Sequence, residues 1–149
     1  MSDDTFRIAE LEMRGYGCSQ ILALMALEAQ GRENPELVRA MSGLLLGMGC
    51  GKVCGALTGG CCVLGIYAGK GSEDSNADPR LPLMLGRFVE WFETEFKGRF
   101  GSIDCCGIVQ DDARQRMARC PLIVTETLGK IREILAENDF HFDEPPASA

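Results

Sequence analysis

The stretch from Met41 to Gly69 most constrains the fold, because Lys52 is its only charged residue. A nearly uncharged stretch of this length can cross a bilayer. However, Lys52 would lie near the middle of the span, where a charge is costly. The stretch is also rich in glycine, and each glycine weakens a continuous helix by about 1 kcal/mol relative to alanine. We therefore predict two buried helices joined by a glycine-rich junction, and no membrane span.

In the rest of the chain apolar residues recur at helical spacing, and no segment shows the alternation typical of a strand. Gly31 ends one helix, whereas Asn34-Pro35 and Asp78-Pro79 each have the form of a helix start. The predicted helices cover residues 3–14, 18–30, 35–46, 54–67, 79–96, 111–119 and 120–138, with a short helix or loop at 105–106.

A chain of 149 residues fits one domain with a single hydrophobic core. We predict an all-α fold, a single compact helical bundle of about five to seven helices, over residues 1–138. A disordered tail is predicted over residues 139–149. The aromatic segment FVEWFETEF, residues 88–96, is interpreted as core, with the interface of a homodimer as the alternative.

The net charge of −7 disfavours nucleic acid and anionic membrane surfaces as partners, since both select basic patches. The first residues, MSDDTFRIAELEMRGYG, lack the basic and apolar regions of a secretory signal, so the expected location is cytoplasmic. In that compartment eight cysteines are not expected to form a static disulfide framework. They indicate metal binding, catalysis, redox chemistry or burial as small apolar side chains.

The only histidine, His141, falls in the predicted tail, where we expect it to be exposed to solvent. Hydrolases of the Cys–His and Ser–His–Asp types need a histidine beside the nucleophile. Hydrolytic catalysis of these types is therefore not predicted.

Four cysteines stand at or near predicted helix starts. Cys18 follows a glycine, and Cys54 follows the glycine-rich junction. Cys120 precedes a proline, and Cys105 follows a turn before a short helical segment. The unpaired amides and the dipole at a helix N-terminus favour negative charge. We therefore predict lowered thiol pKa values at these positions, which would make the thiols better nucleophiles or metal ligands.

The other four cysteines have less specific surroundings. We expect Cys61 and Cys62 to fill space in the core, since adjacent cysteines seldom form unstrained disulfides. For Cys50 and Cys106 the sequence leaves two roles open, an accessory thiol or a space filler. Two roles are also open for Lys52, which either lowers the pKa of a neighbouring thiol or is an exposed loop lysine.

The segments GYGCSQ, CGALTG, FGSIDC and RCPLIV together resemble the C_GCAxxG_C_C family, a group of redox-active bacterial proteins of about this length. A similar module accompanies split-Soret cytochromes, so the resemblance implies electron transfer and an iron–sulfur centre. The haem-attachment motif C-x-x-C-H is absent, and covalent haem is not expected. The resemblance implies that the redox site is formed by Cys18, Cys54, Cys105 and Cys120.

Three functions stay open for these four cysteines. An iron–sulfur cluster for electron transfer is preferred, because four thiolates suit such clusters and glycine-rich loop amides can hydrogen-bond to sulfur. Thiol–disulfide chemistry, in which Cys54 attacks and a second cysteine resolves, needs no cofactor. Structural zinc on the same four thiolates comes third, since a domain of this size hardly needs a metal to fold. We expect a redox partner protein of unknown identity; a pure interaction protein is the remaining alternative.

Overall fold

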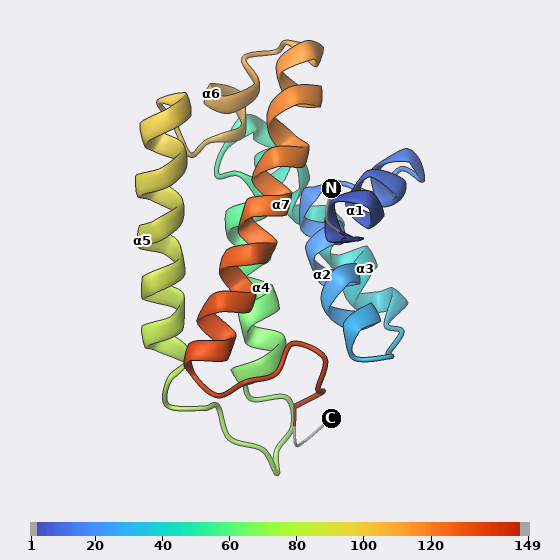
Figure 1. Ribbon diagram of the computed structural model, residues 1–149, viewed down its shortest axis with the longest axis vertical. Coiled ribbons are helices and arrows are strands. Elements are labelled where there is room, and N and C mark those ends of the chain that lie inside the picture. The colour runs from blue at the N-terminus through green and yellow to red at the C-terminus, as the bar shows by residue number, and fades with distance from the viewer. Residues whose placement is uncertain (1–2, 147–149) are drawn as a thin grey trace.

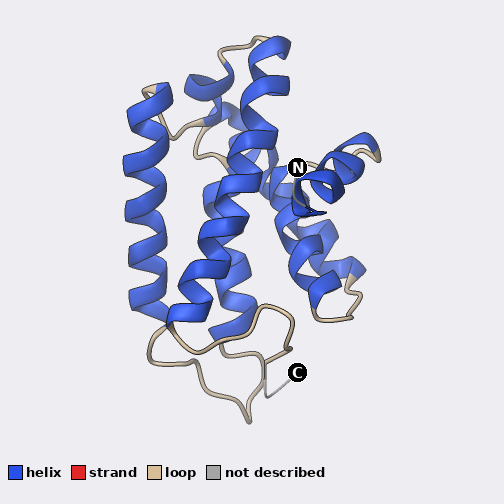
Figure 2. Ribbon diagram, in the orientation of Figure 1, coloured by secondary structure: helices blue, strands red, loops and turns tan. Residues whose placement is uncertain are grey.

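The computed structural model describes residues 3–146, and this part of the chain is all α-helical, as predicted (Figure 1, Figure 2). Within it there is no strand, only an isolated bridge between Val53 and Asp104. Seven α-helices form the bundle, in agreement with the five to seven expected. They are α1 (Asp3–Met13), α2 (Cys18–Ala29), α3 (Pro35–Met41), α4 (Gly55–Ala68), α5 (Leu81–Phe100), α6 (Cys105–Val109) and α7 (Ala113–Glu137).

Helix α4 is the central element, because it packs against α2, α5 and α7. In Figure 1, α4, α5 and α7 run side by side, and α1, α2 and α3 lie beyond them. Glycines allow this close packing. A side chain at Gly59 would meet the Cα of Ser19 at 2.9 Å, and one at Gly60 would meet the ring of Phe88. Glycine at these two positions lets the helices approach closely.

Helix α5 supplies the aromatic part of the core. Phe88, Phe92 and Phe96 recur every four residues and are fully buried. The rings of Phe92 and Phe96 lie 4.7 Å apart at a steep angle, an arrangement that adds about 0.5–1.5 kcal/mol beyond burial. The core interpretation of this segment is therefore confirmed for these three side chains, which are not available to a dimer interface.

The helix predicted over residues 35–46 is shorter than expected. It ends at Met41, and a single 3₁₀ turn, η1 (Ser42–Leu44), leads into a loop. In this loop Leu46 and Met48 have positive φ angles of 56° and 61°, which a right-handed helix cannot accommodate. The glycines of this region weaken the helix enough for the loop conformation to prevail.

The sequence predicts a disordered tail over residues 139–149, and the structure describes residues 139–146, most of which are exposed. Phe142 is the exception: it is 8% exposed, and the Tyr67 hydroxyl donates a hydrogen bond to its carbonyl oxygen (2.6 Å). Burial of this ring favours contact between an otherwise polar segment and the bundle. His141 is exposed, as predicted. The last part of the predicted tail, 147–149, lies outside the described residues, as do residues 1–2.

Between residues 3 and 146, no helix combines the length and the apolar character that crossing a membrane requires. The nearly uncharged stretch 41–69 instead forms the end of α3, the glycine-rich loop and the 14 residues of α4.

Candidate functional site

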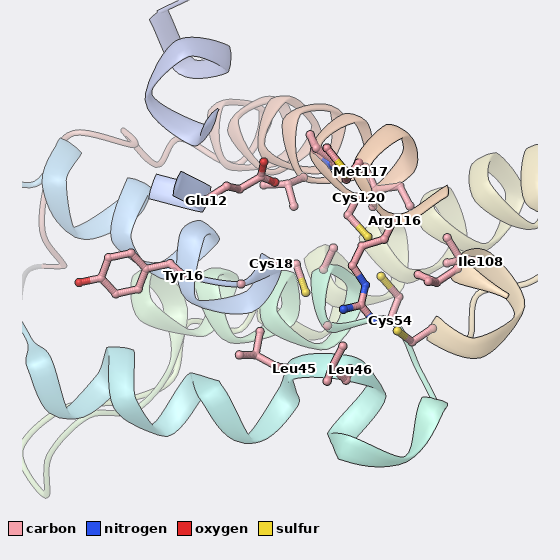
Figure 3. Close-up of a pocket in the computed structure, with 18 of the residues that line it drawn as sticks. Glu12, Tyr16, Cys18, Leu45, Leu46, Cys54, Ile108, Arg116, Met117 and Cys120 are labelled. Atoms are coloured by element: carbon pink, nitrogen blue, oxygen red, sulfur yellow. The ribbon is translucent and has the colours of Figure 1, made fainter. Parts of the chain in front are cut away.

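The four cysteines predicted to form a site line a single pocket of about 500 Å³ (Figure 3). Cys18 begins α2 and Cys54 immediately precedes α4. Cys105 begins α6, and Cys120 lies within α7. All four are partly buried and carry free thiols. The fold thus brings together, from four different helices, residues that are far apart in the sequence.

Backbone hydrogen bonds hold two of the cysteines next to each other. The Cys54 N–H donates to the carbonyl of Ile103 (2.9 Å), and the Cys105 N–H donates to the carbonyl of Lys52 (2.6 Å). The junction before α4 is therefore tied to the turn before α6. No periodicity in the sequence predicts this pairing, because it joins two irregular segments.

A glycine brings the third cysteine to the same place. Gly55 begins α4, and a side chain there would meet the Cys18 Sγ at 2.6 Å and the Leu44 carbonyl oxygen at 2.9 Å. Both contacts are too short for a Cβ atom, so only glycine lets α4 approach α2 at this point. This explains the glycine that follows the cysteine in CGALTG.

The structure contradicts the lowered thiol pKa values expected at the helix starts. Burial, followed by the proximity of Cys54, raises the pKa of Cys18 to about 12. Burial also raises the pKa of Cys54, although the backbone amides of Ala56 and Leu57 at the start of α4 act in the opposite direction. The helix-start effect is present at Cys54, but desolvation outweighs it.

Cys120 is not at a helix start, because the two helices predicted on either side of Pro121 form the single helix α7. The Asp112 side chain accepts a hydrogen bond from the Arg114 N–H (2.9 Å) and caps α7 at its beginning. Pro121 removes one backbone donor, and α7 continues through it. Burial raises the pKa of Cys120 to about 11, and it also raises the pKa of Cys105.

Arg116 brings a positive charge into the pocket and was not predicted to belong to the site. It precedes Cys120 by four residues on α7, a spacing that puts both side chains on one face of the helix. Figure 3 shows Arg116 reaching toward Cys18 and Cys54. Its charge partly counteracts the rise in the pKa of Cys105 and Cys120. The spacing could have identified Arg116 only if the helix predicted to end at residue 119 had been extended to Cys120.

The remaining cysteines do not line the pocket. Cys50, Cys62 and Cys106 are exposed, so the prediction that Cys62 fills the core is wrong. Cys61 is partly buried and packs against the core, as expected. Successive residues on a helix point in directions about 100° apart, and only one of an adjacent pair can face inward. Lys52 is also exposed and outside the pocket, which favours the exposed-lysine interpretation.

The four thiols line a space and do not converge on a point. The described part of the chain contains no group of three histidine, cysteine, aspartate or glutamate side chains arranged around a single metal ion. The thiols are nevertheless close enough to influence one another, since Cys54 and Cys105 both raise the pKa of Cys120 after the larger effect of burial.

Known protein families provide an independent comparison. The family described as "Putative redox-active protein (C_GCAxxG_C_C)" matches residues 16–134, a region that includes all four pocket cysteines. No curated protein and no solved structure matches the chain. Because the family match covers most of the sequence, the chain belongs to the C_GCAxxG_C_C family.

Proposed function

We propose that the pocket holds an iron–sulfur cluster and that the protein transfers electrons by means of it. The observation that carries this proposal is the convergence of four cysteines, from four helices, on one largely apolar pocket. Four thiolates are the usual donor set for [2Fe–2S] and [4Fe–4S] clusters, which supply one-electron chemistry when bound. The residues that would hold the cluster are Cys18, Cys54, Cys105 and Cys120.

The electrostatics of the pocket fit a cationic iron centre. Burial raises the pKa of all four thiols, so that as free groups they keep their protons at neutral pH. Metal ions replace such protons and stabilise the thiolates. The backbone amides of Ala56 and Leu57, which act to lower the pKa of Cys54, are groups of the kind that tune the potential of a bound cluster.

The same geometry disfavours zinc. A tetrahedral zinc ion holds each sulfur at about 2.3 Å, so neighbouring sulfurs lie roughly 3.8 Å apart. The described residues show no such grouping around one ion, and the cysteines would have to move together to create it. A cluster distributes its thiolates over several iron atoms and therefore suits ligands that line a wider space.

Thiol–disulfide chemistry is the second candidate, and the mutual proximity of four free thiols favours it. In this mechanism Cys54 attacks and a neighbouring thiol resolves the intermediate. The raised pKa of Cys54 opposes it, because the thiolate is the nucleophile. We therefore rank this chemistry below the cluster.

Iron, sulfide and zinc analysis, with a visible absorption spectrum, tests the proposal on protein purified without oxygen. We expect bound iron and sulfide in the wild type and their loss in Cys54→Ser. Cys62→Ser makes the same change at an exposed cysteine of α4, and this variant should retain bound iron and bound sulfide. A colourless, metal-free wild type would contradict the cluster. Thiol counting before and after mild oxidation would then distinguish a disulfide switch from inert thiols.

A further inference from the structure

The pocket extends well beyond the four sulfur atoms. Its volume of about 500 Å³ falls in the range of about 300–1,000 Å³ that is usual for small organic ligands. Figure 3 shows Tyr16, Leu45 and Leu46 on the side of the pocket away from Cys120. Walls of this kind bind an apolar body by removing it from water.

Arg116 has no acidic partner in this pocket. None of the ion pairs within residues 3–146 includes it. Arg119, three residues later on α7, differs: it donates to the Ile108 carbonyl (2.9 Å) and lies over the Phe100 ring (4.6 Å). A guanidinium group matches the geometry of carboxylate and phosphate groups and forms two parallel hydrogen bonds with them. Arg116 is therefore placed to receive an anionic group.

The rim of the pocket is apolar and open. Tyr16 is 37% exposed, Leu46 50% and Met117 78%, although all three are large apolar residues. Exposed apolar side chains around the mouth of one pocket are typical of a ligand or partner site. Glu12, whose carboxyl group would repel an anion, lies apart from Arg116 in the pocket (Figure 3).

We propose that the pocket binds a small organic anion, whose acidic group pairs with Arg116 and whose apolar body lies against Leu45 and Leu46. A ligand held in this way lies beside the cysteines and is suited to be the substrate of the redox site. That role rests on the proposed function, whereas the binding itself does not. The chain carries a net charge of −7, so a preference for anions has to come from the local cation.

Calorimetric titration of the intact protein with octanoate and with 1-octanol tests this inference, because the two probes share an eight-carbon chain and differ in charge. We expect saturable binding at one site, tighter for octanoate. Arg116→Gln should weaken octanoate binding roughly 10-fold and leave 1-octanol unchanged. Arg114→Gln, on the same helix and outside the pocket, should change neither. Leu46→Asp adds a negative charge at the rim and should weaken the binding of octanoate more than the binding of 1-octanol.

The absence of saturable octanoate binding to the wild type would overturn the inference, as would an equal loss in Arg116→Gln and Arg114→Gln. Iron content, measured on the same samples, separates this inference from the proposed function. A wild type that binds octanoate but no iron contradicts the cluster and supports the anion site. A wild type that binds iron but no octanoate supports the cluster and contradicts the anion site.

Discussion

The aromatic core and the four-cysteine pocket are built in different ways. The core takes Phe88, Phe92 and Phe96 from one helix at regular spacing, and each ring is fully buried without a polar group. The pocket takes one cysteine from each of four helices, and its thiols are only partly buried. The core lowers the free energy of the folded state by removing apolar surface from water. The pocket instead gathers groups whose burial disfavours their charged form.

This difference separates stability from function. Changes in α5 should alter the free energy of unfolding and leave the chemistry of the pocket intact. Changes in the pocket should alter thiol chemistry or metal content at a smaller cost in stability.

The largest effect is expected in the reactivity of the thiols in reduced, metal-free protein. Cys18 has a pKa of about 12 against an ordinary value of 9.0, and three pH units lower its thiolate fraction about 1,000-fold. Cys62 is exposed and, although partial burial also raises its pKa, it should be alkylated by iodoacetamide before Cys18 at pH 8. Raising the pH toward 12 should narrow the gap, because it deprotonates Cys18. Mass spectrometry of the labelled peptides measures both rates; equal rates at pH 8 would contradict the buried pocket.

The next largest effect is the cost of emptying the aromatic core. Phe92→Ala removes a fully buried ring and should lower the free energy of unfolding by about 3–5 kcal/mol. Leu83→Ala on the same helix, where the side chain is 75% exposed, should change it by less than about 0.5 kcal/mol. Urea denaturation measures both variants. A Phe92→Ala protein that stays stable but loses its iron would contradict the expectation that the core determines stability and the pocket determines function.

The sequence predicts regular elements well because their signals are local. The helix expected over residues 18–30 is found at Cys18–Ala29, and the aromatic helix is buried on the expected side. The resemblance names four cysteines that meet in the structure.

What the sequence leaves unpredicted depends on contacts between distant segments. The continuity of α7 across Pro121 depends on packing that outweighs one lost backbone donor. Arg116 lies on the same face of that helix as Cys120, which a helix ending at residue 119 did not predict. The burial of Phe142 depends on contact with Tyr67, 75 positions earlier in the chain. The raised thiol pKa values follow from burial, which local sequence does not reveal.

A smaller effect tests the contact between α2 and α4. Gly55→Ala places a methyl group against the Cys18 Sγ and the Leu44 carbonyl, and it should cost about 1–3 kcal/mol of unfolding free energy. It should also lower the iron content, because Cys18 has to move. Gly65→Ala on the same helix meets nothing within 4 Å and should raise stability by about 0.5–1 kcal/mol. Urea denaturation and iron analysis of the pair measure this; equal stabilities would mean that α2 and α4 separate easily.

The smallest effect concerns the loop that leads to Cys54. Met48 has a φ of 61° and a side chain that is 46% exposed. A left-handed conformation costs a residue other than glycine about 1–2 kcal/mol, and the flexibility of glycine in the unfolded chain offsets about 0.5–1 kcal/mol of that. Met48→Gly should therefore raise the free energy of unfolding by roughly 0.5–1 kcal/mol, measured by urea denaturation.

Gly49→Ala is the matched reverse change, since Gly49 has a φ of 72° and nothing lies within 4 Å of its added Cβ. It should lower the free energy of unfolding by roughly 0.5–1 kcal/mol, the same net amount with the opposite sign. If Met48→Gly destabilises the protein while Gly49→Ala behaves as expected, the Met48 side chain makes contacts that outweigh its backbone strain. If both follow the expectation, the loop keeps an unfavourable backbone next to the pocket, as functional sites often do. The aromatic helix and the pocket then differ in their backbone conformation as well as in their side chains.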